Sequence, residues 1–196
     1  MPKRTYALVT NAAELRSLLL HPILPTAILC TSADLADKKH ANVRASLRAY
    51  IDKGGRVVVG GPGVNHMAMD EIPTLLSSLG GVGWRLGGYH RTTHFLNSAH
   101  PLYSAADAAV RAALPASYSC KAIVLKDVDP ADMVYRSTPD SGFESLAMAM
   151  DGGKVASNEV AVATAHVGEG WLSWVGDVNQ EAGSTAAMLW LLGLKQ

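Results

Sequence analysis

The chain has 196 residues, and its 17 Lys and Arg balance 17 Asp and Glu, so the formal net charge is zero. Hydrophobic residues make up 48% and charged residues only 17%, against roughly 25% charged residues in an average soluble protein. Zero net charge argues against a nucleic-acid partner, and the apolar content argues against disorder. No apolar run approaches the ~18 residues that span a bilayer. Composition therefore predicts a compact, soluble domain without a nucleic-acid or membrane partner.

The N-terminus and the cysteines indicate a cytoplasmic protein. The apolar stretch after Arg4 is interrupted by Thr10, Asn11 and Glu14, whereas a signal peptide has an uninterrupted apolar run. Cys30 and Cys120 are too few for a disulfide scaffold, and neither belongs to a zinc-type CxxC pair. We therefore expect free thiols, no metal and no cofactor.

The first half of the chain alternates short apolar runs with segments of helical period. A strand is expected at 6–9, followed by a short helix with Asn11 as its N-cap. A second strand is expected at 27–30, then a long helix that ends before Gly54 and Gly55, then a third strand at 56–59. Apolar strands in this order are typical of a parallel sheet that is covered on both faces.

The second half is less regular. We expect helices at 67–79, 105–114 and 181–192, a strand at 120–125, and a hairpin formed by 160–164 and 171–175. Taken together, the elements predict an α/β fold: a three-layer α/β/α sandwich whose mostly parallel, flavodoxin-like sheet carries an antiparallel edge hairpin near the C-terminus. No linker divides the chain, so residues 1–196 are expected to form a single domain.

The third predicted strand runs directly into the turn Gly60-Gly61-Pro62-Gly63, followed by Asn65 and His66. Ligands of open α/β sheets bind beyond the carboxyl ends of the strands, where this turn would lie. The turn holds no Ser or Cys nucleophile, and the chain has no Walker-type or GxGxxG loop. Two interpretations remain: the glycines only turn the chain, or Gly61, Gly63, Asn65 and His66 bind a ligand.

Residues 89–100 form the densest polar cluster, with His90, Arg91 and His94 at its centre. On a helix the two histidines would lie ~6 Å apart, close enough to share a metal. On a strand they would lie ~13 Å apart, and the neighbouring threonines and glycines favour a strand. A metal site is therefore not expected. Either these residues have no specific function, or His90, Arg91 and His94 hold a polar ligand, with the arginine binding an anion.

Asp177 and Asn179 stand between the second hairpin strand and the last helix. Both side chains accept hydrogen bonds from first-turn N–H groups, so capping is the simpler interpretation, with Asn179 as the expected N-cap. The other interpretation is a ligand contact, because this position would share a sheet edge with Gly60–Gly63.

Two segments resemble the class I glutamine amidotransferase-like superfamily, and within it the ThuA-like branch. The first is the string Tyr50-Ile51-Asp52-Lys53-Gly54-Gly55-Arg56-Val57-Val58-Val59-Gly60-Gly61, which is similar to the helix, Gly-Gly, strand and turn at the superfamily's core. The second is 162–177, which resembles the terminal hairpin, where a Gly-x-Gly turn leads to a strand ending in Gly and a polar residue. The resemblance covers the first 63 residues and the last 40 or so.

The superfamily's catalytic residues do not carry over. The resemblance implies a Cys at the turn after the strand, with a His and a Glu near the terminal hairpin. Gly61 or Pro62 occupies the Cys position here, and Asp177 and Asn179 stand where His-x-Glu would be. The resemblance therefore implies a ThuA-like domain without the catalytic Cys and without amidotransferase chemistry.

Two functions are compatible with these observations. The first is binding of a small polar ligand or a protein partner at Gly61, Gly63, Asn65, His66, Arg91 and Asn179. The alternative is a cofactor-independent hydrolase or isomerase that uses His90 or His94 as general acid/base, with Asp177 as a further catalytic candidate. Near-zero net charge and a high apolar content also predict a homodimer.

Overall fold

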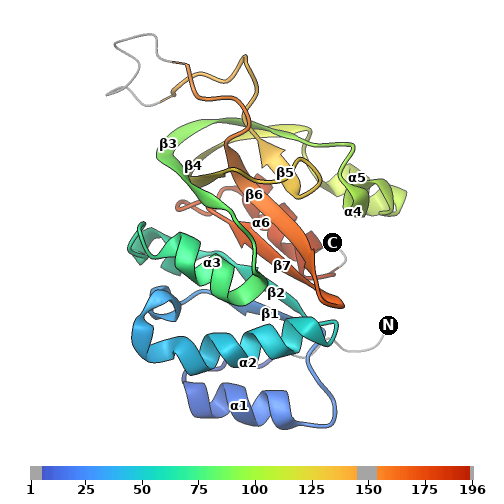
Figure 1. Ribbon diagram of the computed structural model, residues 1–196. Coiled ribbons are helices and arrows are strands. Elements are labelled where there is room, and N and C mark those ends of the chain that lie inside the picture. Colours follow the sequence, from blue (N-terminus) through green and yellow to red (C-terminus); the bar gives the residue numbers. More distant parts are fainter. Residues whose placement is uncertain (1–5, 145–153, 195–196) are drawn as a thin grey trace.

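The computed structural model describes residues 6–144 and 154–194 (Figure 1). Their strands form one sheet in the order β1-β2-β7-β6-β4-β3-β5, and β5 also pairs with β6. The strands are β1 (Ala27–Cys30), β2 (Arg56–Val59), β3 (Arg85–Leu96), β4 (Ser117–Lys126), β5 (Met133–Arg136), β6 (Val160–Val167) and β7 (Gly170–Val175).

The α-helices are α1 (Ala12–Leu20), α2 (Ala41–Asp52), α3 (Ile72–Gly80), α4 (Pro101–Ser104), α5 (Ala108–Ala113) and α6 (Ala182–Leu191). Short 3₁₀ turns, η1 (Ala33–Ala36), η2 (Lys38–His40) and η3 (Pro62–His66), follow β1 and β2. The helices expected at 67–79, 105–114 and 181–192 correspond to α3, α5 and α6, and each is shorter than expected.

Strands β1, β2 and β7 run parallel, and Val57, Val58 and Val59 of β2 are fully buried. Their side chains divide between two apolar clusters. Val57 and Val59 pack with α2 and α3, whereas Val58 packs with α6. Helices therefore cover this part of the sheet on both faces, which is why its strands are apolar at consecutive positions (Figure 1).

The predicted flavodoxin-like sheet is wrong, because the rest of the chain forms a closed antiparallel barrel of four strands. Strand β4 pairs with β3, β3 with β5, β5 with β6, and β6 with β4 at the single pair Leu125–Val160. The labels of these strands lie in the upper part of Figure 1, above those of α2 and α3. The expected α/β/α sandwich with a mostly parallel sheet is therefore not the architecture of this chain.

The expected edge hairpin is a second correction. Strands β6 and β7 do form an antiparallel hairpin, but it lies inside the sheet, with β7 beside β2 and β6 beside the barrel strands. The hairpin thus joins the parallel strands to the barrel. Its position could not be predicted, because the strands on its far side, β3 to β5, come from the middle of the chain.

The residue pattern of β3 does not predict a barrel strand. It has 12 residues, of which only Leu86, Tyr89, Phe95 and Leu96 are large and apolar, and its buried positions are His90, Thr92 and His94. A strand whose buried side is polar does not give the alternation of apolar and polar residues by which strands are recognised. Its long pairing with β4 supplies the hydrogen bonds instead.

Near the N-terminus, one expectation holds and another does not. Asn11 caps α1, its Oδ1 accepting hydrogen bonds from the N–H groups of Ala13 and Glu14. The expected strand at 6–9 is absent from the structure, and Tyr6 is 97% exposed. Apolar composition alone therefore misassigned this segment, because no neighbouring strand buries it.

Candidate functional site

The parallel strands bring their carboxyl ends to one edge of the sheet. Cys30 pairs with Val59 and Val59 with Trp174, and the N–H of Gly60 donates to the Cys30 carbonyl at 3.1 Å. The turns that follow β1 and β2 therefore lie side by side, as expected from the order of the strands.

Two glycines in the turn after β2 have clear structural reasons. Gly61 adopts φ +81°, a backbone conformation that favours glycine. At Gly63, a Cβ atom would lie 1.6 Å from the carbonyl oxygen of Thr31, so no larger residue fits without backbone movement. These contacts explain the glycines as a turn and a close packing of two loops; ligand binding by Gly61 and Gly63 stays a prediction.

Beside this turn lies a polar surface built from Asn65, Tyr89 and Lys121, which we call the carboxyl-edge surface. Tyr89 donates its phenolic hydrogen to Asn65 Oδ1 at 3.3 Å, and the Lys121 ammonium lies 4.7 Å from the centre of the Tyr89 ring. Among the described residues, no carboxylate lies within 4.0 Å of that ammonium. Three elements, η3, β3 and β4, thus supply an amide, a phenol and an unpaired cation. His66 is exposed at the end of η3.

Arg91 is held by a hydrogen-bonded network on the same face of β3 and β4. It pairs with Glu181 at 2.7 Å and donates to Ser119 Oγ at 3.2 Å, and the Glu181 hydrogen bond raises the pKa of Arg91. Ser119 and Thr93 in turn donate to the two oxygens of Glu144 at 2.5 and 2.6 Å. The network therefore contains both a guanidinium and carboxylates, and the Arg91 guanidinium is already paired with Glu181.

Glu144 stays ionised within this network. Its partial burial acts to raise its pKa, but the hydrogen bonds from Ser119 and Thr93 outweigh burial, and its pKa is lowered overall. The carboxylate is an acceptor for donors at the surface of β3 and β4.

Asp177 is buried, with 2% of its surface exposed, and its oxygens accept two backbone hydrogen bonds. Oδ1 accepts from the N–H of Asn179 at 2.9 Å, and Oδ2 from the N–H of Glu181 at 2.7 Å. Both oxygens therefore hold the backbone that leads into α6. The expected N-cap at Asn179 is wrong: Glu181 occupies the cap position, and Asn179 is exposed.

His90 lies on β3, as the spacing of the polar cluster suggested, and is buried. Its Nε2 lies 3.2 Å from Glu159 Oε2, although the angles do not make a hydrogen bond, and its ring contacts Phe143 edge-on. A register irregularity in β3 at Gly87 and Gly88 leaves room for this pair. A Cβ at Gly88 would lie 3.1 Å from His90 Nδ1, and one at Gly87 would lie 3.3 Å from Glu159 Oε1.

His94 lies beside Cys120, a contact that the spacing of the residues along the chain does not predict. Its Nδ1 is 3.5 Å from Cys120 Sγ, and neither residue is exposed. Burial, with the nearby His90, lowers the pKa of His94 to about 4, and burial raises the pKa of Cys120 well above its usual value. At neutral pH both groups are uncharged, and the cysteine is not an activated nucleophile.

The three predicted catalytic candidates, His90, His94 and Asp177, are buried at separate places in the sheet. Ala122 pairs with His90 on one side and bridges to Asp177 on the other, which places these two backbones two strand spacings, about 10 Å, apart. His94 is four residues farther along β3, and all three side chains are buried. Their catalytic role stays a prediction.

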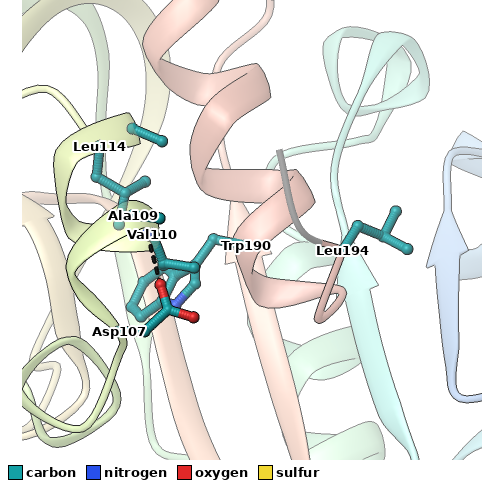
Figure 2. A pocket seen from close by; sticks show the side chains of 7 residues that line it. Asp107, Ala109, Val110, Leu114, Trp190 and Leu194 are labelled. Atoms are coloured by element: carbon teal, nitrogen blue, oxygen red, sulfur yellow. Dashed lines mark hydrogen bonds between the residues drawn. The ribbon is translucent and has the colours of Figure 1, made fainter. Parts of the chain in front are cut away.

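Two hollows lie elsewhere. One, of about 110 Å³, is between α5 and α6, where the Trp190 ring lies against Val110 and the Asp107 carboxylate accepts from the Val110 N–H (Figure 2). The other, of about 340 Å³, is lined by Asn97, Ala99, Pro130, Ala131, Met133, Arg136 and Asn158. Neither includes a predicted site residue.

Within residues 6–144 and 154–194, no group of three or more His, Cys, Asp or Glu side chains is placed to hold a metal ion. None of the helices in the described ranges is long and apolar enough to cross a membrane.

No known family model matches this chain, and no curated protein matches its sequence. Two of the solved structures that match this chain do so at low identity and with TM-scores below 0.5. One is a β-galactosidase from Bacillus circulans sp. alkalophilus, with a TM-score of 0.45 and 12% identity over 87% of this chain and 22% of the other. The second is a putative ThuA-like protein from Parabacteroides merdae ATCC 43184, with a TM-score of 0.42 and 14% identity over 81% of this chain and 67% of the other. The chain thus spans about a fifth of the β-galactosidase.

Proposed function

We propose that this chain is a ThuA-like domain without amidotransferase chemistry, and that it binds a small polar ligand at the carboxyl-edge surface. The observation that carries the proposal is the Lys121 ammonium, which has no carboxylate partner among the described residues and lies over Tyr89, itself bonded to Asn65. A cation, a phenol and an amide that converge from three elements are typical of a polar binding site.

The chemistry of the neighbouring network favours a neutral, hydroxyl-bearing ligand over a polyanion. Arg91 is already paired with Glu181, and Glu144 adds a second carboxylate within reach of the same strands. Hydroxyl groups can donate to such carboxylates and accept from Lys121, whereas a polyanion would meet repulsion. Nucleophilic chemistry is not part of the proposal, since burial raises the pKa of Cys30 to about 12 and that of Cys120 further.

The test is a binding titration with glucose and sucrose as neutral probes and inorganic phosphate as the anionic one, followed by amide chemical shifts. Saturable shifts around Asn65, Tyr89 and Lys121 with a sugar, weakened about tenfold in Lys121→Gln, would support the proposal. Lys126→Gln, at the exposed end of the same strand, is the matched control and should bind as wild type does. Equal binding by Lys121→Gln and wild type would contradict the proposal.

A second candidate function is favoured by one contact. Glu159 lies beside His90, and a carboxylate next to an imidazole is the arrangement that orients a general base. Hydrolysis of p-nitrophenyl acetate between pH 5 and 9 tests this function. His90→Gln should abolish any rate above background, while His166→Gln, which removes an exposed histidine, should not. An equal loss in both variants would assign the rate to surface imidazole.

The homodimer also stays a proposal, supported by the distribution of exposed apolar side chains. Six of the eight large hydrophobic residues that are exposed in the described ranges fall within residues 6–29, among them Tyr6 at 97% and Leu20 at 84%. With no net charge to oppose association, this region is the expected contact. Light scattering at about 100 μM protein should give twice the mass of one chain, and a monomer mass would reject the dimer.

A further inference from the structure

The hollow of about 340 Å³ lies at the opposite end of β3 from the glycine bulge. Its walls are the turn after β3, the connection between β4 and β5, the strand β5 itself, and the turn before β6 that carries Asn158. This volume falls within the range of ~300–1,000 Å³ that is usual for small-molecule sites. None of its lining residues belongs to the carboxyl-edge surface.

Arg136 is the only charged residue among those that line this hollow. Its side chain is half-buried, and its Nη1 donates to Asn158 Oδ1. Within the described ranges, no carboxylate lies within 4.0 Å of the guanidinium, although Asp129 and Asp132 flank the lining residues Pro130 and Ala131 in the sequence. The Asp129 Oδ1 accepts from the N–H of Ala131 instead. The arginine thus faces the hollow with its charge unmatched.

Asn158 and Asn97 line the hollow in different ways, since their side chains bond to different groups. Asn158 adopts φ +66°, a left-handed conformation that asparagine tolerates better than most residues, and its carboxamide reaches Arg136. Asn97 holds backbone on both sides of the hollow. Its Nδ2 donates to the carbonyls of Pro130 and Met133, and its Oδ1 accepts from the N–H of Ala99. Asn97 therefore holds the walls of the hollow in place, and Arg136 and Asn158 form its polar end, where a ligand could be bound.

The remainder of the lining is apolar, from Ala99, Pro130, Ala131 and Met133. One guanidinium fork beside an apolar wall fits a molecule with one carboxylate and an apolar body, because the fork matches a carboxylate in geometry and charge. We propose that this hollow is a second binding site, specific for small monocarboxylates, with the carboxylate on Arg136 and the apolar body against Met133 and Pro130.

Sodium benzoate tests the proposal, with benzyl alcohol as a probe of similar shape without the charge. In wild type at constant ionic strength, benzoate should give saturable amide shifts at Ala99, Ala131 and Asn158. Benzyl alcohol should bind at least tenfold more weakly. Arg136→Gln should weaken benzoate binding about tenfold or more and leave benzyl alcohol unchanged. The benzoate affinity of Arg136→Lys should lie between those of wild type and Arg136→Gln, because lysine keeps the positive charge but lacks the two-pronged guanidinium geometry.

Arg85→Gln is the matched control, since it removes one exposed guanidinium from the far end of β3. It should bind benzoate as wild type does. Unfolding midpoints of all variants should agree within about 2 °C, because the substituted side chains are not in the core. Equal benzoate binding by Arg136→Gln and wild type, equal binding of both probes, or shifts confined to the carboxyl-edge surface would each overturn the proposal.

Discussion

Asp177 is expected to stabilise the protein by holding the backbone at the start of α6. Asp177→Ala removes both carboxylate hydrogen bonds, to the N–H groups of Asn179 and Glu181. A hydrogen bond to a charged group contributes about 1.5–3 kcal/mol, but water can replace the partner of Asn179, which is exposed. We assign about 1 kcal/mol to the hydrogen bond with the Asn179 N–H and about 2 kcal/mol to the one with the Glu181 N–H. The expected loss in the free energy of unfolding is therefore about 3 kcal/mol.

Asn11→Ala provides the scale for this measurement. Asn11 also accepts two backbone hydrogen bonds at a helix start, but it is exposed and neutral, so its loss should cost about 1 kcal/mol. Urea unfolding followed by circular dichroism measures both variants, and the midpoint of Asp177→Ala should fall about three times as far as that of Asn11→Ala, with unchanged slopes. A loss below about 1 kcal/mol for Asp177→Ala would refute the capping role and return Asp177 to the catalytic candidates.

The remaining predictions concern acid stability, a glycine and the thiols. Burial lowers the folded-state pKa of His94 to about 4, below its ordinary value of 6.5, so the unfolded chain binds more protons between these values. Stability should therefore fall as the pH drops from 6.5 to 4, by up to about 3 kcal/mol, and His94→Gln should flatten this slope in thermal melts; an unchanged slope would contradict the assignment. Gly63→Ala would place a Cβ 1.6 Å from the Thr31 carbonyl oxygen and should cost more than about 2 kcal/mol, whereas Gly83→Ala, with no atom within 4 Å, should be within about 0.5 kcal/mol of wild type in urea melts. Cys120 is fully buried and its pKa is raised, so it should react with a thiol reagent such as DTNB only after unfolding; rapid modification of Cys120 in the folded protein would contradict its burial.

Local features of the chain could be predicted where sequence-adjacent residues decide them. Asn11 and the helix after it were predicted correctly because an N-cap needs only the next three residues. Strands β2 and β7 were predicted because both of their faces are covered, which requires apolar side chains at consecutive positions. The segment at 6–9 has the same composition and is not a strand, because no partner strand lies beside it.

The polar residues of the candidate site were visible in the sequence, but their surroundings were not. Arg91 was noted as a polar residue, whereas its partner Glu181 is 90 positions away and meets it only because α6 begins beside β3 and β4. The same holds for Cys120 beside His94, and for Glu159 beside His90, since both contacts depend on the pairing of strands across the barrel. Whether a histidine is a buried neutral group or a reactive one was therefore not readable from spacing.

The amino-acid sequence was sufficient to predict the apolar strands β1, β2 and β7, the hairpin of β6 and β7, and the glycine turn after β2, and it states the balanced charge directly. The sequence did not predict that β3, β4, β5 and β6 close into a barrel or that Arg136 lines a hollow; both features became clear from the three-dimensional fold. This difference follows from the range of the interactions along the chain. Caps, turns and apolar runs are local, whereas strand order and the burial of polar groups depend on pairings between distant segments, which a single sequence does not display.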